Sequence, residues 1–239
     1  MIYSFDGRVR YSEIGENGLL TLPGVLNYFQ DCSIFHSAHT HMDIDALTTH
    51  GFAWVLASWQ VQIFRRPHLG ETVKVTTWAY GFKGFYGYRN FTLEDADGNV
   101  CACANTIWTF LNLNTMHPQK IPEDVRNAYE FFPQYPMENA PRKITVPEGG
   151  MMEKPLTVTN SQIDVYHHMN NAIYIQLAQE YLPEDFDIFE MRAEYSQAAV
   201  PGDVMHPRLI DQKNIFYVIF ETENNGHYAT IEFKRRKEC

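Results

Sequence analysis

The sequence has no run of eighteen apolar residues, and residues 1–6 carry neither the basic flank nor the apolar stretch of a secretion signal. We therefore expect no membrane span and a cytoplasmic location. Positive charge is also scarce, because 19 lysines and arginines face 29 aspartates and glutamates, which gives a formal net charge of −10. This excess of negative charge argues against nucleic acid as a partner.

Cysteine is rare as well. The four cysteines lack the spacing of a zinc site and are Cys32, Cys101, Cys103 and Cys239. Cys101 and Cys103 stand two residues apart, so on a strand they would point to the same face, which disfavours a disulfide between them. We expect the three internal cysteines to be buried as small hydrophobic residues and Cys239 to be a free thiol at the C-terminus.

Polar and ionisable side chains gather in one segment, residues 164–171, which reads DVYHHMNN. An apolar run over 172–182 with helical spacing follows it directly. The segment can therefore bring an acid/base pair and a helix N-terminus to the same small volume. Addition of water to a carbonyl group requires these features.

The same segment has a counterpart near the start of the chain. Residues 12–31 and 161–180 align without a gap at an offset of 149 residues, so that Ser12 meets Ser161. Later similarities keep the same order and pair 67–71 with 200–203, and the turn 97–99 with the turn 224–226. This common order indicates two copies of one unit.

Each copy has the same predicted elements: a short strand and a turn, one long amphipathic helix, and several strands joined by tight turns. Helices are predicted from Pro23 onward, after an N-cap at Asn170 or Asn171, and, in the first copy alone, over 44–50. Strands are predicted over 59–63, 89–93, 99–111, 216–222 and 227–233. A linker rich in Pro and Gly over 132–150 separates a domain 1–131 from a domain 151–239. The predicted class is α+β, with each antiparallel sheet wrapped around one long helix.

Motifs spread over almost the whole chain resemble those of one known family. They stand at residues 10–15, 54–56, 66–67, 70–71, 77–78, 97–98, 120–125 and 168–171. In this order they resemble the acyl-acyl-carrier-protein thioesterase family, which is built as tandem hotdog domains. The resemblance implies hydrolysis of the thioester that ends fatty-acid synthesis, with release of a free fatty acid and the carrier protein. It implies neither a metal nor an organic cofactor.

The catalytic pattern of that family, Asp-x-Asn-x-His with a Glu from a later strand, is matched in part. Asp164 and His168 match its first and last members, whereas Tyr166 stands at the Asn position. Ala198 stands where the Glu is expected, and Ala199 follows it. A cysteine nucleophile at the Ala199 position, an older proposal for the family, is therefore excluded here.

Each residue of this segment has a catalytic and a structural interpretation. His168 can accept a proton from water near pH 7, and Asp164 can orient the imidazole or hold the water. Tyr166 can place the water or the carbonyl group, and backbone N–H groups near Asn170 can receive the oxyanion. The structural alternatives are a turn histidine for His168, a turn or helix-entry residue for Asp164, a packed aromatic for Tyr166 and a helix cap for Asn170.

Apolar residues of the first copy are candidates for binding the acyl chain, with core packing as the alternative for each. They are Leu26, Phe29, Trp54, Leu56 and Trp59. The positions of the first copy that match Asp164, Tyr166 and His168 are Gly15, Asn17 and Leu19, so this copy should bind rather than cleave. An acidic carrier protein would need a local basic dock, for which the candidates are Arg65, Arg66 and residues 234–237.

Three functions are left open by the sequence. Hydrolysis of fatty acyl-carrier-protein thioesters is favoured because the acid/base pair and the helix entry are retained. An acyl-CoA thioesterase is the second, and a non-catalytic protein that binds acyl thioesters, motivated by Tyr166 and Ala198, is the third. Two hotdog units can pair their sheets within one chain, and a homodimer of the whole chain is also compatible with the sequence.

Overall fold

The computed structural model describes residues 1–224 and 226–237, and the chain divides into two compact units. Unit 1 spans Met1–Asn139 and unit 2 spans Ala140–Cys239. The boundary between them lies inside the stretch 132–150 that is rich in Pro and Gly. No helix of the described residues is long and apolar enough to cross a membrane.

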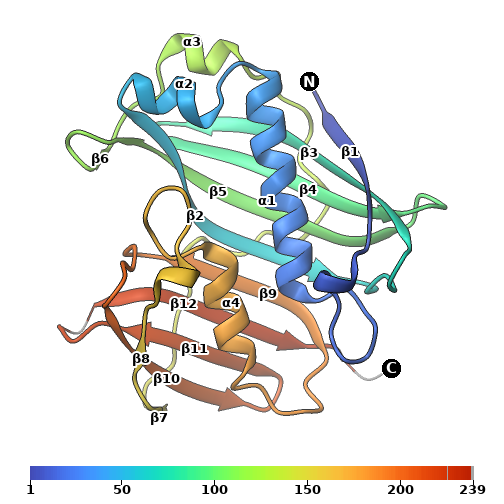
Figure 1. The fold of residues 1–239 in the computed structure, drawn as a ribbon, viewed down its shortest axis with the longest axis vertical. Coiled ribbons are helices and arrows are strands. Elements are labelled where there is room, and N and C mark those ends of the chain that lie inside the picture. Colours follow the sequence, from blue (N-terminus) through green and yellow to red (C-terminus); the bar gives the residue numbers. More distant parts are fainter. Residues whose placement is uncertain (225, 238–239) are drawn as a thin grey trace. The chain divides into compact units, whose positions relative to one another are not determined.

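Unit 1 is an antiparallel sheet with one long helix on its face (Figure 1). In sheet order its strands are β1 (Tyr3–Arg8), β3 (Thr72–Lys83), β4 (Tyr86–Asp95), β5 (Val100–Asn112) and β2 (Phe52–Ile63), and the short β6 (His117–Pro118) pairs with β5. Its helices are α1 (Leu22–His39), α2 (Ile44–Thr49) and α3 (Glu123–Asn127). Both the long helix and the extra helix near 44–50 agree with the prediction.

The helix α1 begins where its sequence provides a cap. The side chain of Thr21 accepts the N–H of Gly24, and Pro23 stands in the first turn, where its missing N–H costs nothing. One side of α1 is buried on the sheet, where the ring of Phe29 packs against Trp59 and Phe91 at centroid distances of 6.2 and 5.1 Å. The contacts place the core of unit 1 between α1 and the sheet.

Unit 2 repeats this plan with shorter elements. In sheet order its strands are β9 (Ile188–Tyr195), β12 (His227–Arg235), β11 (Ile215–Glu221), β10 (Val204–Gln212) and β7 (Met151–Met152), and β8 (Leu156–Thr157) pairs with β10. Its helix α4 (Asn171–Gln179) has 9 residues, half of the 18 in α1. The helix therefore ends at Gln179, before the end of the apolar run 172–182. A long helix was predicted in both copies, and only that of unit 1 is long.

Charged residues lie on one face of β9, where Glu190 and Arg192 are buried and Glu194 is half-buried. They alternate with the core residues Met191 and Ala193. The guanidinium of Arg192 pairs with the carboxylate of Glu232 at 3.1 Å, and its Nη2 donates to the carbonyl oxygen of Pro141 at 2.6 Å. The segment after Pro141 thus covers this face of the sheet and satisfies its buried charges.

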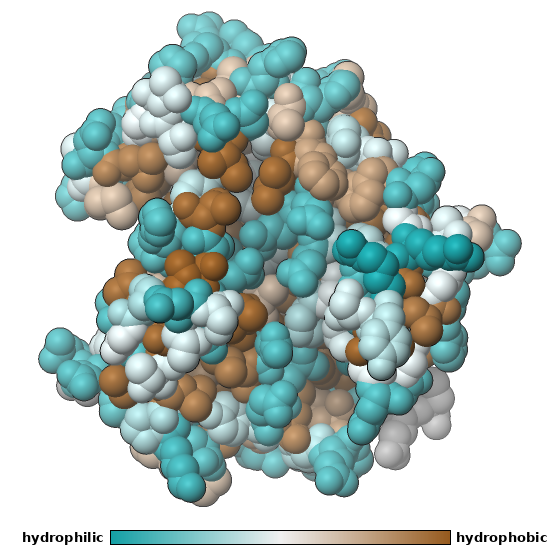
Figure 2. All heavy atoms as spheres, viewed as in Figure 1, coloured by the Kyte–Doolittle hydropathy of each residue, from teal (hydrophilic) through white to brown (hydrophobic). Residues whose placement is uncertain are grey.

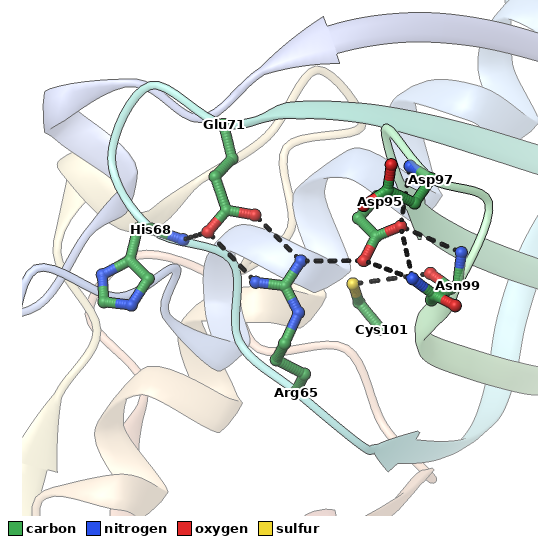
Figure 3. A network of polar contacts seen from close by, with 7 residues as sticks. All are labelled: Arg65, His68, Glu71, Asp95, Asp97, Asn99 and Cys101. Atoms are coloured by element: carbon green, nitrogen blue, oxygen red, sulfur yellow. Dashed lines mark hydrogen bonds and ion pairs between the residues drawn. The ribbon is translucent and has the colours of Figure 1, made fainter.

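The hairpin turn at Asp97-Gly98 forms as predicted. Gly98 has a φ of 83°, which glycine adopts without strain, and the carboxylate of Asp95 accepts the N–H groups of Asp97 and Asn99 (Figure 3). The matching turn in unit 2 includes Asn225, which lies outside the described residues. Cys32, Cys101 and Cys103 are buried free thiols, as expected, whereas Cys239 also lies outside the described residues.

The surface is of mixed character. Large hydrophobic side chains that are exposed include Phe35, Phe131 and Val165. Figure 2 shows hydrophobic residues in small groups between hydrophilic ones on one face of the molecule.

Candidate active site

The segment 164–168 is a closed turn just before α4. The N–H of Asp164 donates to the carbonyl oxygen of His168 at 2.8 Å, and the N–H of His167 donates back to that of Asp164 at 3.0 Å. His167 occupies the left-handed region with a φ of 61°. The turn therefore joins the backbones of Asp164 and His168 directly.

The first copy has the same turn at the predicted offset of 149 residues. The N–H of Gly15 donates to Leu19 O at 3.0 Å, and the N–H of Gly18, whose φ is 75°, donates to Gly15 O at 2.9 Å. A single-turn 3₁₀ helix precedes each turn, at Tyr11–Glu13 and at Asn160–Gln162. The repeat seen in the sequence is thus a repeat of backbone hydrogen bonds.

The side chains of Asp164 and His168 do not bond to each other. One carboxylate oxygen of Asp164 accepts the N–H of Tyr166 at 2.9 Å, so this side chain also shapes the turn. Among the described residues, no hydrogen bond or ion pair joins this carboxylate to the imidazole of His168. Both side chains and that of Tyr166 are half-buried, whereas His167 is exposed. Any catalytic coupling of the two groups would therefore run through a water or substrate atom.

Asn170 is the N-cap of α4. Its side-chain oxygen accepts the N–H of Ala172 at 2.8 Å, and its own N–H donates to Gln162 O at 2.9 Å. The N–H of Asn171, at the first helical position, has no partner within the helix and forms no hydrogen bond with the described residues. Of the N–H groups near Asn170, that of Asn171 is the donor left for an oxyanion.

Ala199 fastens the turn to unit 2 through its backbone. Its carbonyl oxygen accepts the N–H of Met169 at 2.9 Å, and its N–H donates to the hydroxyl of Tyr174 at 3.2 Å. Ala198, at the position expected for Glu, is exposed and carries only a methyl group, and Gln197 is also exposed. These residues therefore bring no carboxylate to the turn.

Tyr174 contributes a hydroxyl group to this site, although it lies within the apolar run predicted over 172–182. Its side chain is 2% exposed, and burial raises the pKa of its hydroxyl, with a smaller contribution from the charges of Asp203 and Asp164. The hydroxyl therefore stays protonated near neutral pH. The repeat offered a signal for it, because the matching residue of the first copy is the apolar Val25.

Unit 1 contains a pocket that encloses about 380 Å³, including space open to solvent. Its lining comes from α1, from the strands and from the segment after α3, and consists of Ser33, Ser37, Trp54, Ala79, Phe82, Gly87, Tyr88, Arg89, Trp108 and Tyr129. Of the five residues predicted to bind the acyl chain, Trp54 lines this pocket. Leu26, Phe29, Leu56 and Trp59 are each at most 3% exposed and lie in the core instead.

The basic residues predicted to dock a carrier protein are mostly in ion pairs. Arg65 bonds to Glu71 and to Asp95 at 2.8 and 3.2 Å (Figure 3), which leaves no excess of positive charge at this place. In unit 2 the pairs are Lys234 with Glu190, Arg235 with Asp185, and Arg236 with Asp187. This pairing removes the charge argument for a basic dock. Among the described residues no cluster of three or more His, Cys, Asp or Glu side chains could hold a metal.

Solved structures share this fold. An acyl-ACP thioesterase from Bacteroides thetaiotaomicron has 22% identity and a TM-score of 0.89 over 98% of both chains. The 12:0-ACP thioesterase from Umbellularia californica has 18% identity and a TM-score of 0.86 over 99% of this chain and 98% of that one. The fold is therefore a tandem hotdog, in the α+β class that the sequence predicts.

Family models identify the chain more closely. The model of the acyl-ACP thioesterase N-terminal domain matches residues 2–129, and that of the C-terminal domain matches residues 147–229. The chain belongs to the acyl-ACP thioesterase family, as its motifs suggested.

Curated relatives are longer than this chain. The palmitoyl-acyl carrier protein thioesterase of Cuphea hookeriana is 28% identical over 204 residues, which cover 77% of this chain and 48% of the relative. The oleoyl-acyl carrier protein thioesterase 1 of Arabidopsis thaliana is 26% identical over 221 residues, which cover 82% and 60%. The chain thus spans about half to three fifths of the length of these relatives.

Proposed function

We propose that this protein hydrolyses fatty acyl-acyl-carrier-protein to a free fatty acid and the carrier protein. The observation that supports the proposal is the closed turn of unit 2, which joins the backbones of Asp164 and His168 and leads into α4, where the N–H of Asn171 has no partner among the described residues. Membership of the acyl-ACP thioesterase family across both domains supports the choice of substrate.

The proposed reaction uses water as the nucleophile. His168 takes a proton from the water as its oxygen attacks the thioester carbon, and the N–H of Asn171 donates to the oxygen that gains charge. The carbon–sulfur bond then breaks, and the imidazolium returns the proton to the leaving thiolate. Asp164 stabilises the imidazolium through its negative charge and positions the water between the two side chains.

Tyr166 and Ala198 distinguish this site from the family pattern. Tyr166 replaces an amide that has a donor and an acceptor with a hydroxyl that has both on one atom, so it can still hold the water. Ala198 offers no substitute for a carboxylate, and the proposal assigns the whole proton transfer to His168. The two substitutions also favour a second candidate, a protein that binds acyl thioesters without cleaving them.

The test is release of free thiol from a panel of acyl-carrier-protein and acyl-CoA substrates of several chain lengths. We expect turnover with carrier-protein esters, and a loss of about 10²- to 10⁴-fold in His168→Ala, since this is what a general base contributes. His167→Asn is the matched control, because residue 167 is exposed and asparagine tolerates its left-handed backbone.

The possible results separate the candidates. Turnover by folded wild-type protein that does not exceed that of His168→Ala would refute hydrolysis. Tight binding without cleavage, with activity appearing in a Tyr166→Asn, Ala198→Glu double variant, would establish the binding protein. Equal or faster turnover of CoA esters would make the protein an acyl-CoA thioesterase instead.

A further inference from the structure

Arg89 on β4 is a buried cation that no carboxylate of the described residues accompanies. Its side chain belongs to a residue only 8% exposed, and burial lowers its pKa, although a guanidinium keeps its proton in proteins. Its partners are neutral, namely the imidazole of His36 at 2.8 Å, the hydroxyl of Thr77 at 3.2 Å and the ring of Tyr129. A buried charge without an opposite charge is costly, so its retention needs a reason.

The hydrogen bonds of Arg89 use only one of its three nitrogens. Both protein bonds come from Nη1, whereas Nε and Nη2 donate to none of the residues that the structure describes. Arg89 also lines the pocket of unit 1, so these N–H groups are available to a ligand there. An arginine with Nε and Nη2 free offers the fork of two parallel donors that suits a carboxylate.

The imidazole of His36 adds a second unsatisfied group. Its Nδ1 accepts from Arg89, so its proton lies on Nε2, and this atom has no hydrogen-bond partner although the residue is 1% exposed. Because burial and the neighbouring Arg89 lower the pKa of His36 to about 3, the ring is neutral and leaves the charge of Arg89 uncompensated. Both groups next to the pocket therefore lack an acceptor.

The rest of the pocket suits a hydrocarbon. The side chains of Trp54, Phe82, Ala79 and Trp108 supply an apolar wall, while hydroxyl groups come from Ser33, Ser37, Tyr88 and Tyr129. The hydroxyl of Ser37 already bonds to that of Tyr129 at 3.2 Å, and that of Ser33 donates to Gln30 O. An apolar wall with one cation is the complement of an aliphatic chain that ends in an anion.

We propose that the pocket of unit 1 binds an aliphatic carboxylate, with its two oxygens on Nε and Nη2 of Arg89 and its chain against Trp54, Phe82 and Trp108. Two sources share this chemistry. One is a free fatty acid, which would enter head first and which the proposed thioesterase reaction produces. The other is the far end of an acyl chain derived from a dicarboxylic acid. Binding itself does not depend on the proposed reaction.

The direct test uses tryptophan fluorescence, because Trp54 and Trp108, two of the four tryptophans of the chain, line the pocket. We expect decanoate to quench or shift the emission at concentrations about 10- to 100-fold lower than decanol or decylamine. Decanol lacks the negative charge and the second acceptor oxygen, and the ammonium of decylamine has no acceptor and is repelled by the guanidinium. This comparison needs only the unmodified protein and no turnover. Equal binding of decanol and decanoate would overturn the proposal.

A pair of variants locates the carboxylate. Arg89→Met should weaken decanoate binding by about 10- to 100-fold while leaving that of decanol unchanged. Arg8→Met is the matched control, because Arg8 is exposed and lies outside the pocket, and it should bind decanoate as the wild type does. Folded Arg89→Met that binds decanoate as tightly as Arg8→Met would also overturn the proposal.

Two further binding measurements distinguish a free fatty acid from the far end of an acyl chain as the ligand. If the free acid is the ligand, decanoate binds at least as well as a carrier-protein half-thioester of decanedioic acid. If the acyl chain end is the ligand, that half-thioester binds more tightly than the decanoyl ester, and the preference disappears in Arg89→Met. If the wild-type protein binds decanoate but cleaves no thioester, the proposed function is refuted and the carboxylate site is not.

Discussion

The loops that precede α1 and α4 share a backbone hydrogen-bond pattern and differ in their side chains. In the first copy the closed turn carries Gly15 and Leu19, and in the second it carries Asp164 and His168, at identical places in the hydrogen-bond pattern. The scaffold of the turn therefore does not depend on the acid/base pair. The first copy thus has the framework without ionisable side chains at these two places, while the second carries a carboxylate and an imidazole on it.

The helices α1 and α4 also differ, both in length and in the groups that lie beside them. The longer α1 stands over a pocket with a buried cation, whereas the shorter α4 begins at the turn with Asp164 and His168. Under the proposed function, unit 1 binds the acyl chain and unit 2 cleaves the thioester. Substitutions at matched places of the two units can break or sharpen this comparison, and the largest effects are expected where charge is buried.

The buried pair of unit 2 should matter far more than the exposed pair of unit 1. Glu232→Ala leaves Arg192 buried without its carboxylate and should lower the free energy of unfolding by about 3–5 kcal/mol. Glu71→Ala removes a partner of Arg65, whose side chain is 41% exposed, and should cost about 1 kcal/mol or less. Urea unfolding of both variants checks this, and equal costs would contradict the ranking.

His36 should make the stability of the protein sensitive to acid. Its pKa in the folded state, about 3, lies below the ordinary 6.5, so the unfolded chain binds the proton more readily. Stability should therefore fall by up to about 1.4 kcal/mol per pH unit as the pH drops from about 6.5 toward 3.

The measurement for this prediction is urea unfolding between pH 7 and pH 4 of the wild type and of His36→Gln. The difference between the two slopes isolates the histidine from the carboxylates that titrate in both proteins. If the free energy of unfolding depends on pH equally in both proteins, the folded state does not lower the pKa of His36, and the prediction is wrong.

The two N-caps should have equal structural effects and unequal functional ones. Thr21→Ala and Asn170→Ala each remove a cap bond and should lower the free energy of unfolding by about 1 kcal/mol. Only Asn170→Ala should also lower kcat, because that cap positions the N–H of Asn171. Unfolding and thiol-release measurements on the same two preparations decide, and an equal loss of kcat in Thr21→Ala would remove this distinction.

Substitutions at the left-handed residue of each turn, Gly18 and His167, should give the smallest difference in stability between the two units. Gly18→Ala places a Cβ in open space, so its cost of about 1 kcal/mol comes from the φ of 75° alone. His167 already sits at the same place with a φ of 61°, and His167→Ala should change stability by only a few tenths of a kcal/mol. Thermal unfolding of both variants tests whether the two positions are equivalent.

Local signals in the sequence were sufficient for much of the fold. The offset of 149 residues, the cap at Asn170 and the Asp97-Gly98 turn each follow from short-range chemistry, and the structure has all three. The helix after Asn170 ends at Gln179, earlier than its apolar pattern suggested. The pattern runs on because Tyr181 and Leu182 are half-buried although they follow the helix.

The pocket could not be predicted in the same way. Leu26 and Phe29 are apolar residues of a helix, and the sequence does not tell whether such residues fill a core or line a cavity. Arg89 reads as an ordinary strand residue, and its burial depends on His36 and Thr77, which are distant in sequence. The ion pairs of the basic run 234–237 could not be predicted for a related reason, since their partners lie on other segments.

The most direct test of the division between the units is the thiol-release rate of His168→Ala beside Leu19→Ala, the same position in the two copies. With acyl-carrier-protein as substrate, we expect kcat to fall about 10²- to 10⁴-fold in His168→Ala and to stay within about twofold of the wild type in Leu19→Ala. A folded His168→Ala protein with wild-type kcat, or an equal loss in both variants, would contradict the account.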